Sequence, residues 1–233
     1  MYLFTRAFRW RSGTLLALLL SLSLPIRVIA EDAKVPEVAT QPRVVIKVDV
    51  TDAPDLADWA EKAKRLCETW HSIIVDLLGM KDPPVYREVT LRFGKMRGIA
   101  ATTKDTVNIS AQFVREHPDD FGMVLHELTH VIQAYPQYDP VWLVEGIADY
   151  VRYWHCEPGL REFPINEKSN YTDSYGTTAR FLAWVAVTKD SRIVKKLSQA
   201  LRDGKYKEEM FRDATGKDLK ELWREFATAV REK

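Results

Sequence analysis

The pentapeptide HELTH at residues 126–130 constrains this chain more than any other feature. Residues four apart on a helix lie on one face, so His126 and His130 point the same way and can hold one zinc ion together. At about 100° per residue, the surrounding sequence divides into two faces. The first holds Met123, His126, Glu127, His130 and Gln133, and the opposite one holds Phe121, Val124, Leu125, Leu128, Val131 and Ile132. We therefore expect a helix that presents a metal site on one face and packs on the other.

A third metal ligand is expected, because catalytic zinc takes three protein ligands and keeps one position open. Glu145 is the candidate, within WLVEGIADYVR at residues 142–152. Asp139 and Pro140 are predicted to be the N-cap and the first residue of a second helix, which packs back beside the first. The face of Glu145 is expected to carry Trp142, Glu145, Asp149 and Arg152.

Two neighbours of Glu145 receive supporting roles. Asp149 lies one turn further on, where a carboxylate can accept the second ring N–H of a zinc-bound histidine. We assign this role toward His126. Gly146 is expected to let the second helix approach the metal helix closely, and the simpler interpretation is a tolerated glycine. His155 is an alternative third ligand that no spacing argument supports.

Three segments carry a family resemblance: HELTHVIQAY at 126–135, WLVEGIADYVR at 142–152 and YGTTARFLAW at 175–184. Together they resemble the plant and bacterial basic secretory protein family of peptidases, and the ligand pattern resembles the gluzincins. The resemblance implies an α+β, zincin-like domain with a small mixed sheet, an HExxH helix, a glutamate helix and a helical C-terminal part. It also implies Zn2+ on His126, His130 and Glu145. Metzincins need a glycine and a third histidine where this chain has Gln133 and Pro136, so that subclass is excluded.

The resemblance also predicts the chemistry of the site. Glu127 is expected to act as the general base and later to return the proton to the departing amine. A second donor besides the metal is needed for the oxyanion. We predict Tyr175, because it opens the helix after the glutamate helix, as a tyrosine does in related aminopeptidase-type gluzincins. The alternatives are Tyr171, Tyr138 and Tyr150.

Two other classes of function are alternatives to a peptidase. A zinc-containing module that binds peptide or glycoprotein with little turnover has no need of a base beside the metal, so Glu127 argues against it. A zinc-stabilised structural domain usually closes its site with four protein ligands, often cysteines. Neither Cys67 nor Cys156 has such a spacing.

The N-terminus predicts export. Residues 1–30 contain three early arginines, an apolar run at 14–26 and the sequence Val28-Ile29-Ala30, which is typical of a signal peptide cleaved near Ala30. The run is too short to span a bilayer comfortably, and an uncleaved anchor is the alternative. Cleavage removes four arginines and no acid, which lowers the formal charge from +1 to about −3. We expect a secreted or periplasmic monomer that binds protein or peptide substrates, with no nucleic-acid partner and no stable membrane association.

The remaining chain is predicted to comprise a polar leader at 31–42 and one catalytic domain at 43–233. Strands are expected at 43–50 and 85–93, with a pair of short strands within 98–110. Helices are expected at 55–78, 175–188, 190–201 and 217–231. By resemblance, 99–109 contains an open edge strand that binds peptide substrate in extended form.

The remaining cysteines, histidines and aromatics receive structural interpretations. A Cys67–Cys156 disulfide and a buried, small apolar Cys67 both remain possible. His71 is expected on a helix surface and His117 in a loop. Phe211, Trp223 and Phe226 are expected in the core.

Overall fold

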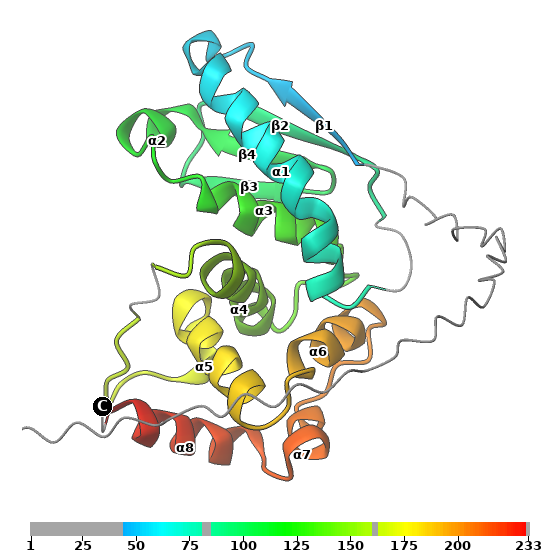
Figure 1. Cartoon of the computed structure of the whole chain (residues 1–233), viewed down its shortest axis with the longest axis vertical. Coiled ribbons are helices and arrows are strands. Elements are labelled where there is room, and N and C mark those ends of the chain that lie inside the picture. The colour runs from blue at the N-terminus through cyan, green and yellow to red at the C-terminus, as the bar shows by residue number, and fades with distance from the viewer. Residues whose placement is uncertain (1–43, 81–84, 160–162, 232–233) are drawn as a thin grey trace, which may run out of the picture. The chain divides into compact units, whose positions relative to one another are not determined.

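A four-stranded mixed sheet forms one part of the domain (Figure 1). Its strands are β1 (Val45–Asp49), β2 (Glu88–Gly94), β3 (Ala100–Thr103) and β4 (Thr106–Ser110). The order is β1-β2-β4-β3, with β1, β2 and β4 parallel and β3 antiparallel to β4. In the central strand β2, Val89, Leu91 and Phe93 are buried and alternate with more exposed residues, as expected for a sheet covered on one face. The predicted α+β class is confirmed.

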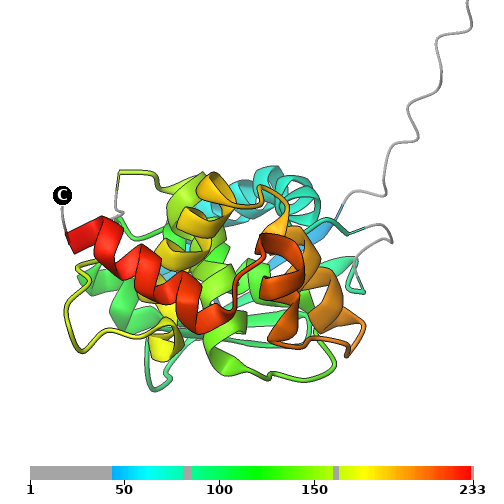
Figure 2. The same cartoon turned by 90° about the horizontal axis from the view of Figure 1, so that it is seen from below.

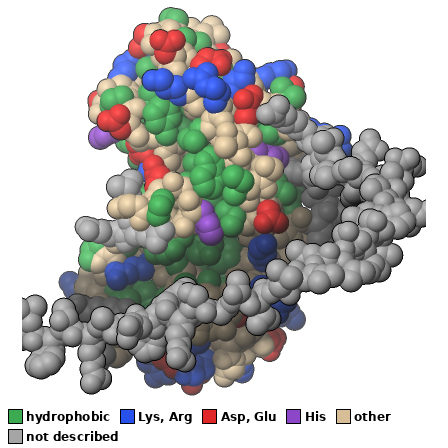
Figure 3. Space-filling model, viewed as in Figure 1, with side chains coloured by type: hydrophobic (Ala, Val, Ile, Leu, Met, Phe, Trp, Pro, Cys, Tyr) green, Lys and Arg blue, Asp and Glu red, His purple; other side chains and the backbone are tan. Residues whose placement is uncertain are grey.

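This computed structural model describes residues 44–80, 85–159 and 163–231. The predicted signal peptide at 1–30 and the leader at 31–42 lie outside these residues. The described part belongs to one compact unit, Thr40–Lys233. None of its helices is long and apolar enough to cross a membrane. Figure 3 shows hydrophobic side chains gathered across the middle of one face, with a band of Lys and Arg nearer its upper end.

Two helices cover the sheet, namely α1 (Ala57–Leu77) and α3 (Gly122–Gln133) (Figure 1). The short turn η1 (Pro54–Leu56) leads into α1, which matches the helix predicted at 55–78. The core stripe of α1 consists of Trp59, Ala60, Ala63, Cys67 and Ile74. The apolar face of α3 is likewise buried. The helix also packs against α4.

The C-terminal half is helical, and α8 lies on the side of α4 and α5 away from the sheet (Figure 1, Figure 2). Its elements are α4 (Val141–Val151), the π-helical turn η2 (Arg152–Cys156), η3 (Tyr171–Asp173), α5 (Tyr175–Thr188), α6 (Ile193–Arg202), α7 (Glu209–Thr215) and α8 (Leu219–Arg231). Rings from α5, α7 and α8 form one cluster, in which Phe181 lies 5.5 Å from Trp223 and 5.6 Å from Phe226 between centroids. Phe211 also packs on Phe181, so the three predicted core aromatics are buried together.

Two short helices were not expected: α2 (Ala111–Glu116) and α7. In α2 the Ser110 side chain accepts a hydrogen bond from the Phe113 N–H, which caps the helix locally. Helices of two turns or fewer display too little periodicity to be recognised by pattern alone.

The start of α4 differs from the prediction. The helix begins at Val141, and Pro140 is the N-cap with extended backbone (ψ 134°), so Asp139 is not the cap. Trp142 does not share the face of Glu145 and Asp149 toward the site. It packs on Tyr171 instead, with ring centroids 5.2 Å apart. Because α4 is buried between α3 and α5, nearly all of its sides contact protein and its faces cannot be told apart by polarity.

Gly146 and His71 differ from the prediction, and the structure also defines the state of the two cysteines. A Cβ on Gly146 would lie 2.2 Å from Thr178 Cγ2, so this glycine permits close contact with α5, not with the metal helix. His71 is buried, not on the helix surface, and burial lowers the pKa of its imidazole. Cys67 and Cys156 are both free thiols in this structure.

Candidate metal centre

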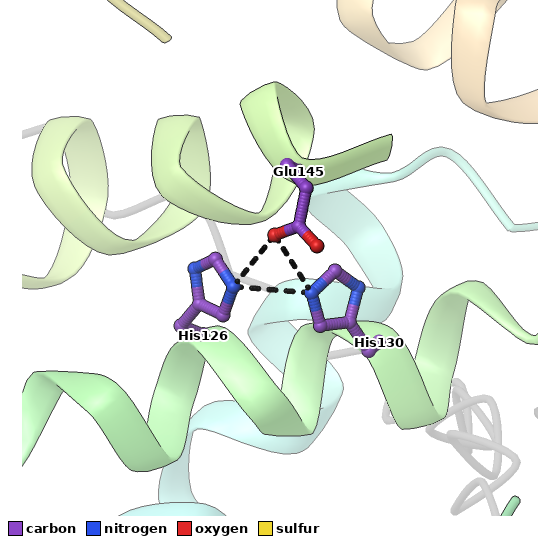
Figure 4. A group of neighbouring side chains, drawn as sticks. All are labelled: His126, His130 and Glu145. Carbon is purple, nitrogen blue, oxygen red and sulfur yellow. Dashed lines mark hydrogen bonds and ion pairs between the residues drawn. The ribbon is translucent and has the colours of Figure 1, made fainter. Parts of the chain in front are cut away.

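Two histidines and one glutamate converge between α3 and α4 (Figure 4). His126 Nε2 lies 3.1 Å from Glu145 Oε2 and 3.1 Å from His130 Nε2. The third pair, His130 Nε2 and Glu145 Oε2, is 3.4 Å apart. All three side chains are about nine-tenths buried. Three electron-pair donors from two helices therefore meet in a largely buried space, which is the arrangement that a bound cation requires.

Each histidine is held by a second side chain through its other ring nitrogen. Asp149 Oδ1 lies 2.6 Å from His126 Nδ1, as the sequence predicted. Gln133 Oε1 lies 2.7 Å from His130 Nδ1, and its Nε2 donates to the Val144 carbonyl at 3.1 Å. Both imidazoles are thus oriented with Nδ1 toward a protein acceptor and Nε2 toward the centre.

The Gln133 contact suits an amide in particular. Gln133 is 1% exposed and needs an acceptor atom toward His130 and a donor atom toward the Val144 carbonyl. A glutamate at this position would place a carboxylate against that carbonyl, and leucine would offer neither group. Gln133 was placed on the correct helix face, but its partner could not be inferred from the spacing.

Glu145 is fixed at both carboxylate oxygens. Its Oε2 faces the histidines, and its Oε1 accepts a hydrogen bond from the Tyr138 hydroxyl. Burial raises the pKa of the Glu145 carboxyl. The hydrogen bonds from His126 and His130 lower this pKa by a larger amount, so it lies well below its ordinary value. Glu145 therefore stays ionised, as a metal ligand must.

The pKa of His126 is raised to about 9. Burial alone lowers it, and the hydrogen bonds to Asp149 and Glu145 raise it by more. The Coulombic field of Glu127 acts in the same direction. The carboxylates around this one buried imidazole therefore give the site a negative charge, which is compatible with a cation.

Glu127 lies beside the two histidines and is 8% exposed. Thr102 Oγ1, on the edge strand β3, is 2.7 Å from Glu127 Oε2 and 2.9 Å from its main-chain oxygen. This contact joins the helix that carries the ligands to the sheet. Sequence reasoning missed it, because residues 102 and 127 belong to elements whose relative position no local pattern defines.

A cleft of about 1010 Å³ opens onto His126, His130 and Glu145, the three candidate ligands. Its lining includes residues 99–102, of which 100–102 belong to β3, together with Tyr138 and Tyr175. Tyr175 begins α5 with a φ of 47°, a conformation that is uncommon for a tyrosine. Its ring stacks on that of His126 with centroids 6.1 Å apart, and burial raises the pKa of its hydroxyl. A substrate reaching the ligands would therefore pass these groups.

Arg152 holds the end of the glutamate helix in place. Its guanidinium contacts Asp120 Oδ1 at 2.6 Å and Glu157 Oε2 at 2.8 Å. Asp120 precedes α3, and Glu157 follows η2, so the ion pairs tie the start of α3 to the chain that follows α4. His155, the alternative third ligand, lies in η2 and is not part of the metal-binding group found among the described residues.

Comparison with known proteins identifies the family of this chain. A sequence model of the family described as peptidase of plants and bacteria (BSP) matches residues 55–226. The chain belongs to this family, which confirms the resemblance to the plant and bacterial peptidase family and supports a peptidase-like function. The matched span includes the three candidate ligands, Glu127 and Tyr175. Searches of curated proteins and of solved structures gave no significant match.

Proposed function

We propose that this protein is a secreted zinc peptidase of the gluzincin type with a zincin-like fold. His126, His130 and Glu145 would hold Zn2+, and Glu127 would serve as the general base. The observation that carries this proposal is the convergence of the three donor atoms in a cleft that Glu127 also lines. The peptidase family of the chain supports the reaction class.

The spacing of the donor atoms fits zinc. Ligand atoms bound tetrahedrally at about 2.0–2.1 Å lie about 3.3–3.4 Å from one another. The observed separations are 3.1, 3.1 and 3.4 Å. Two imidazole nitrogens and one carboxylate oxygen are also a donor set that zinc accepts in catalytic sites.

The chemistry divides between the metal and the chain. When bound, zinc lowers the pKa of water toward neutrality and polarises a carbonyl group. Glu127 accepts a proton from the attacking water and delivers it to the amine that leaves. The contacts of Asp149 and Gln133 keep the histidine Nε2 atoms directed into the site. The second contact of Gln133, to the carbonyl that precedes Glu145, holds the glutamate helix in register.

Tyr175 is the proposed donor to the oxyanion. The hydroxyl of Tyr138 donates a hydrogen bond to Glu145 Oε1, so the proposed role of Tyr138 is to orient Glu145. Tyr175 lines the cleft next to His126, and 55% of its surface is exposed. Its uncommon backbone conformation is the kind of strain that gathers at functional sites. Tyr171 is buried in the aromatic cluster and is set aside.

The substrate is proposed to be a protein or peptide that pairs with β3 in extended form. The strand lies at the edge of the sheet and lines the cleft, which supports this placement. We further propose that the enzyme acts outside the cytoplasm, because residues 1–30 have the composition of a signal peptide. N-terminal sequencing of the exported protein tests this, and a start near Glu31 is expected.

The experiment that tests the function compares the purified mature protein with its Glu127→Gln variant. Both are incubated with a mixed peptide library, and bound metal is measured in each. Cleavage that is lost in the variant while zinc is retained supports the peptidase. Absence of cleavage by both proteins contradicts it and favours a zinc-containing binding module.

A further inference from the structure

The register of the β3–β4 pair determines which main-chain groups of β3 point to the open edge of the sheet. Ser110 N donates to Ile99 O at 2.9 Å, and Ala100 is paired with Ile109. Hydrogen-bonded and non-hydrogen-bonded pairs alternate along an antiparallel ladder. The N–H and C=O of residues 99, 101 and 103 therefore point to β4, and those of Ala100 and Thr102 point to the opposite side. No strand of the described chain pairs with that side of β3.

One residue of this open edge also contacts the general base. Thr102 Oγ1 lies within hydrogen-bond distance of two Glu127 oxygens, at 2.7 Å from Oε2 and 2.9 Å from the main-chain oxygen. A threonine side chain is restricted about χ1, whereas glutamate has three rotatable bonds. The strand is thus able to fix the position of the longer side chain.

We propose that Thr102 is a positioning residue that aligns the Glu127 carboxylate with a peptide paired to β3. Its main-chain N–H and C=O receive the peptide, and its hydroxyl holds the base, so a single residue sets the distance between substrate and base. This inference rests on the proposed peptidase function. It adds the register of the bound peptide, which pairs with Ala100 and Thr102, and the residue that couples this register to Glu127.

The main test is Thr102→Val, which keeps the shape and strand preference of the side chain and removes the hydroxyl. In the zinc-loaded protein, kcat is expected to fall about ten- to a hundredfold, the effect of losing one hydrogen bond to a charged group. KM is expected to stay unchanged, because the main chain of β3 is intact. Thr102→Ser is expected to restore kcat, and Thr102→Ala to lose as much as valine.

Thr103→Val is the matched control. Thr103 is the next residue of β3, is exposed and has its side chain on the opposite face. The same substitution there is expected to leave kcat and KM unchanged. Bound zinc and thermal unfolding midpoints are measured for every variant, and all are expected to match the wild type.

A second arm tests the register without catalysis. Ala100→Pro removes an N–H that faces the open edge and leaves the ladder to β4 in place. In protein freed of metal by chelation, this variant is expected to bind an extended test peptide more weakly than the wild type. Thr102→Val is expected to bind the peptide as well as the wild type does.

The outcomes separate this inference from the proposed function. If the wild type cleaves no peptide, the peptidase itself is contradicted. If the wild type cleaves and Thr102→Val keeps its kcat, or serine fails to restore it, the role of Thr102 is refuted while the peptidase stands. A loss of kcat that accompanies loss of zinc or of thermal stability also overturns the positioning role.

Discussion

At the scale of single residues, the two histidines differ in what holds them. The Nδ1 atom of His126 is hydrogen-bonded to the carboxylate of Asp149, and that of His130 to the neutral amide of Gln133. A carboxylate forms the stronger hydrogen bond to a ring N–H and makes the opposite nitrogen a better donor to a metal. We therefore expect His126 to depend more on its partner than His130 does.

Replacing Asp149 by alanine tests the stronger of these contacts. Zinc affinity, measured by competition with a chelator, is expected to fall about ten- to a hundredfold, because the ring of His126 loses its orientation. Asp149→Asn, which retains an acceptor oxygen, should fall less. An alanine variant with wild-type affinity would refute the supporting role of Asp149.

Gln133→Leu tests the weaker contact. The substitution removes both the acceptor for His130 and the donor to the Val144 carbonyl, and zinc affinity is expected to fall by about tenfold, the lower end of the range for such partners. The assay is the same chelator competition. If zinc affinity falls more in Gln133→Leu than in Asp149→Ala, the expectation that His126 depends more on its partner is wrong.

The two tyrosines of the cleft are expected to separate by what their loss affects. Tyr175→Phe should lower kcat about a hundredfold, as removal of one oxyanion donor does, while zinc affinity is retained. Tyr138→Phe should weaken zinc binding, because Glu145 loses the hydrogen bond at Oε1. Titration with zinc and steady-state kinetics on both variants distinguish the roles, and the opposite pattern would exchange them.

The pH dependence of zinc binding follows from His126. Its pKa is raised to about 9 in the metal-free protein, because the hydrogen bonds to Asp149 and Glu145 outweigh burial. Zinc requires the neutral ring, so at lower pH a proton must leave as the metal binds. Zinc affinity is therefore expected to increase from pH 6.5 toward about pH 9 and then to level off. Calorimetry in buffers of different ionisation enthalpy measures the released proton, and a pH-independent affinity would contradict this account.

At the scale of elements, the contact of α4 with α5 depends on Gly146. Alanine would favour the helix by about 1 kcal/mol, but its Cβ would meet Thr178 Cγ2 at 2.2 Å in a fully packed region. We expect Gly146→Ala to lower the free energy of unfolding by about 1–3 kcal/mol. Chemical denaturation measures this, with Gly146→Ala/Thr178→Ser as the partly restored control. A stabilised single variant would show that α5 yields at this contact.

The elements that the sequence predicted are those with a clear period. The helix that carries HELTH shows a polar and an apolar face, and α1 and α8 likewise have one buried stripe. The alternation in β2 is equally visible. In α4 both sides are buried, so neither the position of Trp142 nor the partner of Gly146 followed from polarity. The two-turn helices α2 and α7 were not predicted, because they are too short to display a helical period.

At the scale of the whole molecule, the site is assembled from β3, from the continuous stretch that runs through α3, the following loop and α4, and from the start of α5. The faces that carry the candidate ligands and Asp149 were predictable, because each of these residues stands at a helical spacing from a neighbour within α3 or α4. The contacts of Thr102, Tyr138 and Gln133 depend on how β3, the loop before α4 and α4 itself are placed around α3. That placement is produced by core packing, which a local pattern does not encode.

The most direct measurement for the central claim is zinc analysis of the purified mature protein combined with X-ray absorption at the zinc edge. We expect one zinc per chain, bound by two imidazole nitrogens and one carboxylate oxygen at about 2.0–2.1 Å, with the remaining position taken by water. Substitution of Glu145 by alanine should remove the carboxylate oxygen and most of the affinity. A protein that takes up no zinc, or that binds it through sulfur or a third histidine, would contradict the assignment of His126, His130 and Glu145.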